Sequence, residues 1–366
     1  IFYINFTNIL NTIVELLCMT NPPELQNNTN AITIHRALED LQWDLKNTRY
    51  LYYTPPIAGL GGLISGRIFT LFAGLALGRT ARFIELADPP YDQVFEPMHL
   101  PVREKVNTAN LSPLLYEGRQ EDSIVVYDPI RCAPITQFDM ERFSTIICEK
   151  YGIERIPHQI IEGYIFLWMS PVADISQYCG LAIERFGPDV NTLGVHWRRG
   201  DKATETAYVP ADIINSSIEK LYLSWKFTRI FLASDSSRAI DELVAPRNVE
   251  VIFDYEETRY NNANHKMLIR SPELSKIETL TAFKNIILLS RCGGLIGQDN
   301  AHFAHIASSV IAARRESLRN ILLISGGIAE ENSIITKIYY NVYRKVRKFA
   351  KGKLPFLTAN SRYRSD

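Results

Sequence analysis

Two adjacent arginines, Arg198 and Arg199, follow directly on an apolar run over residues 190–197. The run is typical of a buried strand, so the arginines would stand at its carboxyl end. Core packing does not account for them, because Arg, Asp and Lys are rarely buried without a partner. In α/β sheets ligands bind at that edge, and a guanidinium fork suits a phosphate or diphosphate. The sequence therefore predicts an anion site here; a surface turn closed by an Arg–Asp salt bridge fits these residues about equally well.

The composition of the 366-residue chain limits the classes of function. Charge is balanced, with 40 Lys+Arg and 40 Asp+Glu, which argues against a nucleic-acid partner held by bulk electrostatics. The apolar fraction of 46% is that of a folded globular protein, and the length allows two domains with separate cores. Three asparagines and a glutamate interrupt residues 1–19, so this stretch is not a clean membrane span. Because the first residue is Ile1, we expect membrane attachment only through an anchor upstream of it.

Apolar periodicity and turn residues predict strands that alternate with helices along most of the chain. The predicted strands cover residues 49–54, 82–86, 123–127, 193–197, 229–233, 249–253, 294–297 and 320–324. The predicted helices cover residues 37–45, 63–78, 140–151, 158–186, 211–223, 237–244, 272–292 and 300–312, followed by one near 330–348. Alternation at this spacing indicates parallel sheets and an α/β fold.

A glycine-rich turn, Gly59-Leu60-Gly61-Gly62, separates the first predicted strand from the helix that follows. A strand, glycine loop and helix in this order let backbone amides approach a phosphate. Glycine-rich turns also serve packing alone, so the turn by itself is a weak signal.

Residues 196–210 resemble the H-x-R-R-x-D-K…E-A-x-x-x-P stretch of α1,6-fucosyltransferases. Similar arginine-bearing strands occur in nodulation fucosyltransferases and in protein O-fucosyltransferases. Residues 231–235 look like the second motif of this family, and residues 288–296 precede the position of the third. The turn at 59–62 is similar to the family's N-terminal G-x-G turn. The resemblance covers roughly residues 49–324 and implies a GT-B fold, in which two Rossmann-like domains face a cleft.

The pattern along the chain predicts four regions, and the resemblance assigns roles to the two in the middle. Residues 1–47 would be a helical extension, 48–187 an acceptor-side Rossmann-like domain, 188–328 the Rossmann-like domain that binds a nucleotide sugar, and 329–366 a helix with a basic tail.

The implied reaction is an inverting, metal-independent transfer of fucose from GDP-fucose to a hydroxyl of a glycan or glycoprotein, without a cofactor. Arg198 would neutralise the leaving diphosphate, as an electrostatic catalyst must. Glu205 would take the proton from the acceptor hydroxyl, with Lys202 and Asp201 close enough to tune or orient it. Arg199 is expected to pair with Asp201 and to fix the loop.

Further positions are expected to bind the donor. They are His196, Arg199, Gly59, Gly61, Gly62, Asp235, Asn285, Asn300, Ala301 and His302. Asp235 fits a helix cap at least as well.

The chain departs from the family at two places, which involve three of these residues. Asn300 and Ala301, followed by His305, stand where the family has a hydroxyl residue and then an arginine. The acid that recognises guanine falls on Asn285, whose amide accepts hydrogen bonds with one end only. Two alternatives therefore stay open: a transferase that uses another nucleotide sugar, and an inactive relative that binds a glycan or nucleotide.

A metal-dependent site is a third alternative, because Asp299, His302 and His305 have ligand chemistry and close spacing. No fourth ligand is evident, and the five cysteines form no C-x-x-C pair and no zinc spacing, so we expect no metal. The resemblance to animal enzymes implies the Golgi lumen, whereas the bacterial relatives imply the cytoplasm.

Overall fold

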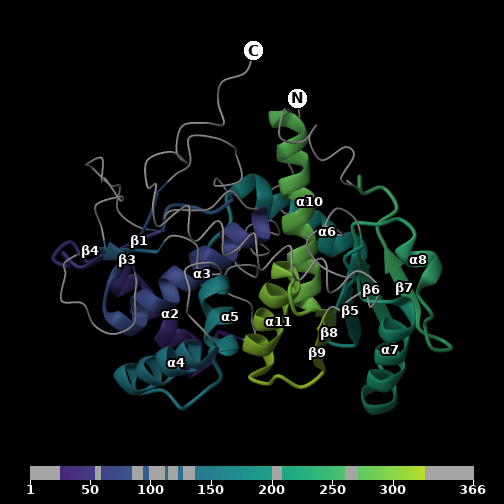
Figure 1. Cartoon of the computed structure of the whole chain (residues 1–366), viewed down its shortest axis with the longest axis horizontal. Coiled ribbons are helices and arrows are strands. Elements are labelled where there is room, and N and C mark those ends of the chain that lie inside the picture. Colours follow the sequence, from purple (N-terminus) through teal and green to yellow (C-terminus); the bar gives the residue numbers. More distant parts are fainter. Residues whose placement is uncertain are drawn as a thin grey trace, which may run out of the picture.

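The computed structural model of the chain describes residues 25–53, 59–84, 94–98, 112–113, 123–126, 137–199, 208–259 and 271–325. In this part of the chain two parallel β-sheets lie on opposite sides of a group of helices (Figure 1). The predicted α/β class is confirmed.

The first sheet has the strand order β2-β1-β4-β3 and is parallel throughout. Its strands are β1 (Tyr50–Tyr53), β2 (Thr80–Phe83), β3 (Ser112–Pro113) and β4 (Ser123–Val126). The described helices before residue 152 are α2 (Thr29–Gln42), α3 (Leu60–Leu77) and α4 (Gln137–Tyr151).

The first helix, α2, begins eight residues before the predicted range of 37–45. Asn28 is its cap, because the side-chain oxygen accepts a hydrogen bond from the amide of Ala31 at 2.9 Å. The sequence prediction followed the apolar pattern alone and missed this cap. Strand β2 likewise lies two to three residues before its predicted range, because Gly78 ends α3 in the left-handed conformation and the strand follows almost at once.

Helix α3 is apolar on every side and lies inside the protein. By length and composition it could cross a membrane, yet 89% of its 18 residues are buried among the other elements. A helix that is apolar all round belongs either in a core or in a bilayer, and here it forms the core of the first half.

The single helix predicted over 158–186 is wrong. The structure has two helices instead, α5 (His158–Trp168) and α6 (Ala173–Phe186). Pro171 lies in the interruption, where a proline cannot donate a helical hydrogen bond, and it forms a β-bridge with Phe95. Gly187 ends α6 in the left-handed conformation.

The second sheet has the order β7-β6-β5-β8-β9 and is also parallel. Its strands are β5 (Thr192–His196), β6 (Arg229–Ala233), β7 (Glu250–Phe253), β8 (Gly294–Gln298) and β9 (Ile321–Ile324), close to the predicted ranges. The helices of this half are α7 (Ala211–Trp225), α8 (Ala239–Glu242), α10 (Pro272–Arg291) and α11 (His302–Arg315). Val190, predicted as part of the buried run, is 63% exposed and precedes β5. The chain order reverses between β5 and β8, which makes their carboxyl ends the topological switch point where such sheets bind ligands.

The helices between the sheets hold the two halves together. Helix α5 packs along α11, and α6 packs along α10. Gly163 permits the first contact, because a Cβ at this position would overlap the carbonyl oxygen of Ser309. One hydrophobic cluster contains Phe166 from α5 and Val310 from α11. The domain boundary near residue 187 therefore stays a prediction, since the described packing runs across it.

Candidate functional site

The two arginines stand where the sequence predicted them, at the carboxyl end of β5. The backbone N–H of Arg198 donates a hydrogen bond to Oε1 of Gln298, the last residue of β8, at 3.0 Å. Gln298 is buried, so this bond fixes the arginine loop across the switch point. The arginine pair therefore begins at the edge where a parallel sheet offers a ligand site.

Asp235, just beyond β6, holds both arginines. Its Oδ1 accepts a hydrogen bond from the backbone N–H of Arg199 at 2.6 Å, and its Oδ2 lies 3.9 Å from Nε of Arg198. The alternative of a helix cap is wrong, because α8 has Arg238 at its N-cap and no side-chain cap bond. Asp235 thus fixes the backbone of the arginine loop and lies within ion-pair distance of the Arg198 guanidinium.

The side chain of Arg199 packs against Trp197 and helix α8. Its guanidinium forms an ion pair with Glu242 of α8 and lies 4.9 Å from the centre of the Trp197 ring. Asp201, its expected partner, lies outside the described residues, and the partner that the structure shows is Glu242. The expected loop-fixing role of Arg199 is compatible with these contacts, and its donor-binding role stays a prediction.

The glycine turn has a different form from the one expected. Gly59 is the N-cap of α3, whereas Gly61 and Gly62 lie in the first turn of the helix. A Cβ on Gly61 would lie 2.6 Å from the ring of Phe303 and 2.9 Å from Cβ of His302. The absence of a side chain at Gly61 therefore brings the N-termini of α3 and α11 into contact.

Helix α11 begins at His302, two residues later than predicted, with the buried Ala301 as its N-cap and the exposed Asn300 before it. Nδ1 of His302 lies 3.0 Å from Oγ of Ser65 on α3, which joins the two helix starts through side chains. Each helix N-terminus carries unsatisfied N–H groups and the positive end of a helix dipole, and both favour an anion.

His196 connects β5 to the start of α11. Its ring centre lies 5.8 Å from that of Phe303, and its Nδ1 has no hydrogen-bond partner among the described residues. Burial, together with the charge of Arg198, lowers the pKa of His196 to about 3. The imidazole is therefore neutral at physiological pH.

Asn285 lies on α10, in a buried polar network beside β7. Its Nδ2 donates to Oε1 of Glu257 at 2.8 Å, and its Oδ1 has no partner among the described residues. Nζ of Lys284 donates to Oδ2 of Asp254 at 2.6 Å and lies 3.4 Å from Oε2 of Glu257. Burial raises the pKa of Glu257, although the charges of Lys284 and Arg259 oppose this.

This network reaches the arginine loop through one residue. Nε of Arg259 donates to the carbonyl oxygen of Ser234 at 3.1 Å, and Ser234 precedes Asp235. Oγ of Ser234 in turn donates to the carbonyl oxygen of Trp197 at 2.6 Å. The polar groups of β5, β6, β7 and α10 therefore form one connected layer.

The geometry does not support the alternative metal site. His302 faces Ser65, whereas Nε2 of His305 faces the carbonyl oxygen of Asp299. The Asp299 carboxylate accepts a hydrogen bond from Ser325 at 2.7 Å. Across the described ranges no three His, Cys, Asp or Glu residues lie close enough together to hold a metal ion.

Three of the expected catalytic residues, Asp201, Lys202 and Glu205, lie outside the described residues, and their roles stay predictions. Sequence reasoning missed several residues that shape the site: Ser65, Glu242, Glu257, Gln298 and Phe303. Gln298 had a usable signal, because it directly follows the predicted strand 294–297. The others are recognisable only from their contacts.

No protein-family model and no curated protein matches the chain. Several solved structures have a similar course of the chain. One is the NodZ alpha-1,6-fucosyltransferase soaked with GDP-fucose, with 15% sequence identity and a TM-score of 0.42. The match covers 72% of this chain and 93% of the NodZ chain. A variant of FUT1 from Arabidopsis thaliana in complex with GDP gives 11% identity and a TM-score of 0.47 over 82% and 77%. POFUT1 in complex with GDP gives 16% identity and a TM-score of 0.38 over 78% and 100%. Likenesses at these low values carry no argument about activity, so the chemistry of the site has to be argued from its own residues.

Proposed function

We propose that this chain is a glycosyltransferase that binds a nucleoside diphosphate sugar at the switch point of its second sheet. The observation that carries the proposal is the anchoring of Arg198 at that point, with its backbone held by Gln298 and its side chain near Asp235. A guanidinium whose backbone is held at the ligand-binding edge of a parallel sheet suits a diphosphate.

The same geometry supports a metal-independent transfer. Charge builds up on the diphosphate as the bond to the sugar breaks, and preorganised positive groups stabilise that charge. Arg198 supplies a permanent charge, and the starts of α3 and α11, joined through Gly61 and His302, supply helix-dipole ends. The neutral His196 adds a ring nitrogen beside them without adding charge.

The finer assignment to fucose, with inversion at the sugar carbon, comes from the motif in residues 196–210. In that assignment Glu205 accepts the proton of the acceptor hydroxyl while the hydroxyl oxygen attacks the sugar carbon directly. A single displacement of this kind inverts the configuration of the carbon. The resemblance to α1,6-fucosyltransferases names GDP-fucose as the donor and a glycan or glycoprotein as the acceptor.

A transferase with a different nucleotide sugar is the second candidate, and Asn285 is the observation that favours it. The amide nitrogen of Asn285 already donates to Glu257, so only its Oδ1 remains to meet a base. Guanine presents two N–H donors, N1–H and N2–H, on one edge. The carboxylate that the family has at this position would accept both hydrogen bonds. One acceptor matches a base that presents a single N–H, such as uracil.

Donor turnover separates these proposals. Release of GDP from GDP-fucose, and of UDP from UDP-sugars, would be measured with a panel of glycan acceptors, with and without a chelator. We expect chelator-insensitive turnover of GDP-fucose that falls by on the order of two to three decades in Arg198→Ala. Arg319→Ala, which changes an exposed arginine beyond α11, is the matched control and should retain wild-type turnover. Loss of turnover in chelator, or wild-type turnover in Arg198→Ala, would contradict the proposal, and preference for a UDP-sugar would favour the second candidate.

A further inference from the structure

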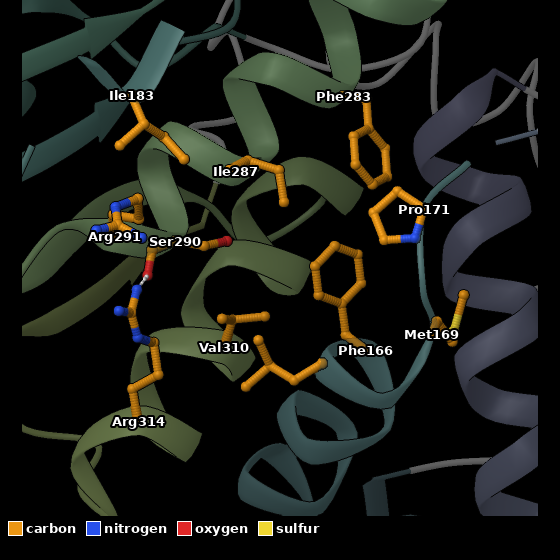
Figure 2. A pocket seen from close by; sticks show the side chains of 11 residues that line it. Phe166, Met169, Pro171, Ile183, Phe283, Ile287, Ser290, Arg291, Val310 and Arg314 are labelled. Carbon is orange, nitrogen blue, oxygen red and sulfur yellow. Dashed lines mark hydrogen bonds between the residues drawn. The ribbon is translucent and has the colours of Figure 1, made fainter. Parts of the chain in front are cut away.

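Helix α10 places two polar residues, Lys284 and Asn285, inside the protein. Its Phe283 and Ile287 line an apolar pocket against α5 and α11 (Figure 2). Lys284 and Asn285 are only 2% and 7% exposed, and they lie instead in the polar network beside β7. Buried polar groups are nearly always hydrogen-bonded, so an atom of this network that has no partner requires an explanation.

The Asn285 side chain has one satisfied end and one unsatisfied end. Its Nδ2 donates to Oε1 of Glu257 at 2.8 Å. Its buried Oδ1 has no hydrogen-bond partner in the part of the chain that the structure describes. A buried acceptor without a donor costs free energy. A ligand that brings an N–H group to Oδ1 would remove this cost.

Glu257 decides which end of the amide is left over. Nζ of Lys284 lies 3.4 Å from its Oε2, and Nη2 of Arg259 lies 3.9 Å from the same oxygen. The two cations favour the carboxylate form of Glu257 against the opposing effect of burial. A carboxylate only accepts hydrogen bonds, so Asn285 has to present its NH2 group to Glu257 and keep its oxygen for another partner.

The network lies at the same edge of the second sheet as the arginine loop. Asp254, the partner of Lys284, directly follows β7, and Arg198 lies two residues beyond the end of β5. Only β6 separates these strands, and neighbouring strands lie about 4.8 Å apart, so the two strand ends are roughly 10 Å from each other. This separation suits a nucleoside diphosphate with its phosphates at Arg198 and its base at the network.

We propose that Glu257 is a positioning residue that makes Asn285 select a nucleobase with a ring N–H group on its pairing edge. The inference rests on the proposed nucleotide site at the switch point, and it applies to guanine and uracil alike. Oδ1 of Asn285 would accept a hydrogen bond from N1–H of guanine or from N3–H of uracil. Adenine and cytosine have an acceptor nitrogen at the corresponding position, and two acceptors that face each other repel. The site would therefore reject these two bases.

Calorimetric titration of the full chain with UDP and CDP tests the inference, because the two pyrimidines have nearly the same shape and differ in the donors and acceptors of the pairing edge. We expect the wild type to bind UDP about tenfold more tightly than CDP. The purine pair GDP and ADP gives the same contrast at N1, so the ratio can be measured whichever ring size the site prefers.

Glu257→Gln should bring the two affinities of each pair to within about threefold of each other. A glutamine amide both donates and accepts, so it no longer fixes the orientation of the Asn285 amide. Glu256→Gln is the matched control, because this neighbouring glutamate is exposed and pairs with Arg185 at the surface. The control should keep the base preference of the wild type.

A purely structural role for Glu257 would have a different signature. Loss of packing would weaken all four nucleotides alike and would leave the ratios unchanged. Inorganic pyrophosphate has no base, so it should bind equally to the wild type and to Glu257→Gln. If Glu257→Gln does not fold, Asn285→Ala provides a second test, since removal of the amide should also abolish the base preference.

Two results would overturn the inference and leave the nucleotide site in place. One is a wild type that binds both members of each pair equally or prefers CDP or ADP. The other is a folded Glu257→Gln that keeps the full ratio of the wild type. Absence of binding of every nucleoside diphosphate and of pyrophosphate would instead contradict the proposed function, and the inference with it.

Discussion

Arg198 and His196 lie two residues apart, but one side chain is charged and the other is neutral. Arg198 keeps its guanidinium charge near Asp235, whereas His196 is buried and uncharged. The two states are linked, because the charge of Arg198 adds to burial in lowering the pKa of the imidazole. A site that binds a diphosphate gains from this arrangement, since it combines one fixed charge with a neutral hydrogen-bonding ring.

The buried imidazole should make stability depend on pH. The pKa of His196 is about 3 in the folded protein and near its ordinary 6.5 in the unfolded chain, so between these values the unfolded state binds more protons. Stability is therefore undiminished above pH 6.5 and falls as the pH drops toward 3. Between pH 7 and 5 we expect the wild type to lose about 2 kcal/mol more free energy of unfolding than His196→Gln. Urea unfolding at both pH values measures this difference, and equal losses would contradict it.

Glu205 carries a prediction that rests on the motif alone. Glu205→Gln should lower turnover by on the order of two decades or more, because a neutral amide cannot accept the proton of the acceptor hydroxyl. Donor affinity should stay close to that of the wild type, since the role of Glu205 lies on the acceptor side. Turnover and donor binding would both be measured on the same preparation. A collapse of donor binding would instead make Glu205 a binding or structural residue.

The sequence predicted the position of the arginine pair but not its partners. An abrupt change from apolar to charged residues marks a strand end, so Arg198 could be placed at an edge of the sheet from local pattern. Gln298 and Glu242 lie 100 and 43 residues away along the chain, and only the strand order and the position of α8 bring them near. Asp201 was expected beside Arg199 because it is close in sequence, and that reasoning overlooked the acid on α8.

At the scale of elements, the contact between the starts of α3 and α11 shapes the site. Gly61 has no side chain at the point where the ring of Phe303 and Cβ of His302 approach α3. Two helix N-termini are thereby directed toward one region. From the sequence, we expected the glycines to let the backbone approach a phosphate. In the structure, Gly61 lets helix α11 approach helix α3.

Gly61→Ala should therefore separate the two helix starts. A Cβ 2.6 Å from the Phe303 ring forces a shift, and such overpacking costs about 1–3 kcal/mol of stability despite the better helix propensity of alanine. Affinity for a nucleoside diphosphate should fall with it. Gly59→Ala is the matched control, because a Cβ there meets nothing within 4 Å, and loss of a glycine N-cap costs at most about 1 kcal/mol. Equal stability and equal nucleotide affinity in the two variants would contradict the assigned contact.

Strands were easier to predict than helix ends. The strands of the second sheet are short apolar runs between turn residues, and β6 matches its predicted range of 229–233. The predicted helix over 158–186 ran through Pro171, because residues on both sides have apolar periodicity and the helix-breaking signal of the proline was overlooked. The cap at Asn28 was overlooked because the amphipathic pattern used for the prediction begins only at residue 37.

At the scale of the whole molecule, one hydrophobic cluster joins the first sheet to α10 and α11, and a second cluster joins these two helices to the second sheet. Gly163 lets α5 lie directly on α11, and Ile306 of α11 belongs to the same hydrophobic cluster as Ile161 of α5. The sequence indicated two Rossmann-like units but could not show how extensively they pack against each other. A helical pattern shows which face of a helix is apolar, but it does not show which element packs on that face.

Because α10 and α11 contribute to the hydrophobic clusters of both halves, the chain should unfold as one unit. Ile306→Ala removes buried methyl groups from the common cluster and should cost about 2–5 kcal/mol of stability. Unfolding curves followed by tryptophan fluorescence and by far-ultraviolet circular dichroism should shift together and remain coincident. Two separate transitions, with only one moved by the substitution, would show that the halves unfold independently.

The central claim, that the switch point of the second sheet binds a nucleoside diphosphate through Arg198, is tested most directly by calorimetric titration with GDP and UDP. The titrations would use wild type, Arg198→Ala and the control Arg319→Ala, each with and without a chelator. The account predicts nucleoside diphosphate binding in the wild type and the control, indifferent to the chelator, and a loss of affinity of about tenfold or more in Arg198→Ala. Absence of binding to either nucleotide, or undiminished affinity in Arg198→Ala, would contradict it.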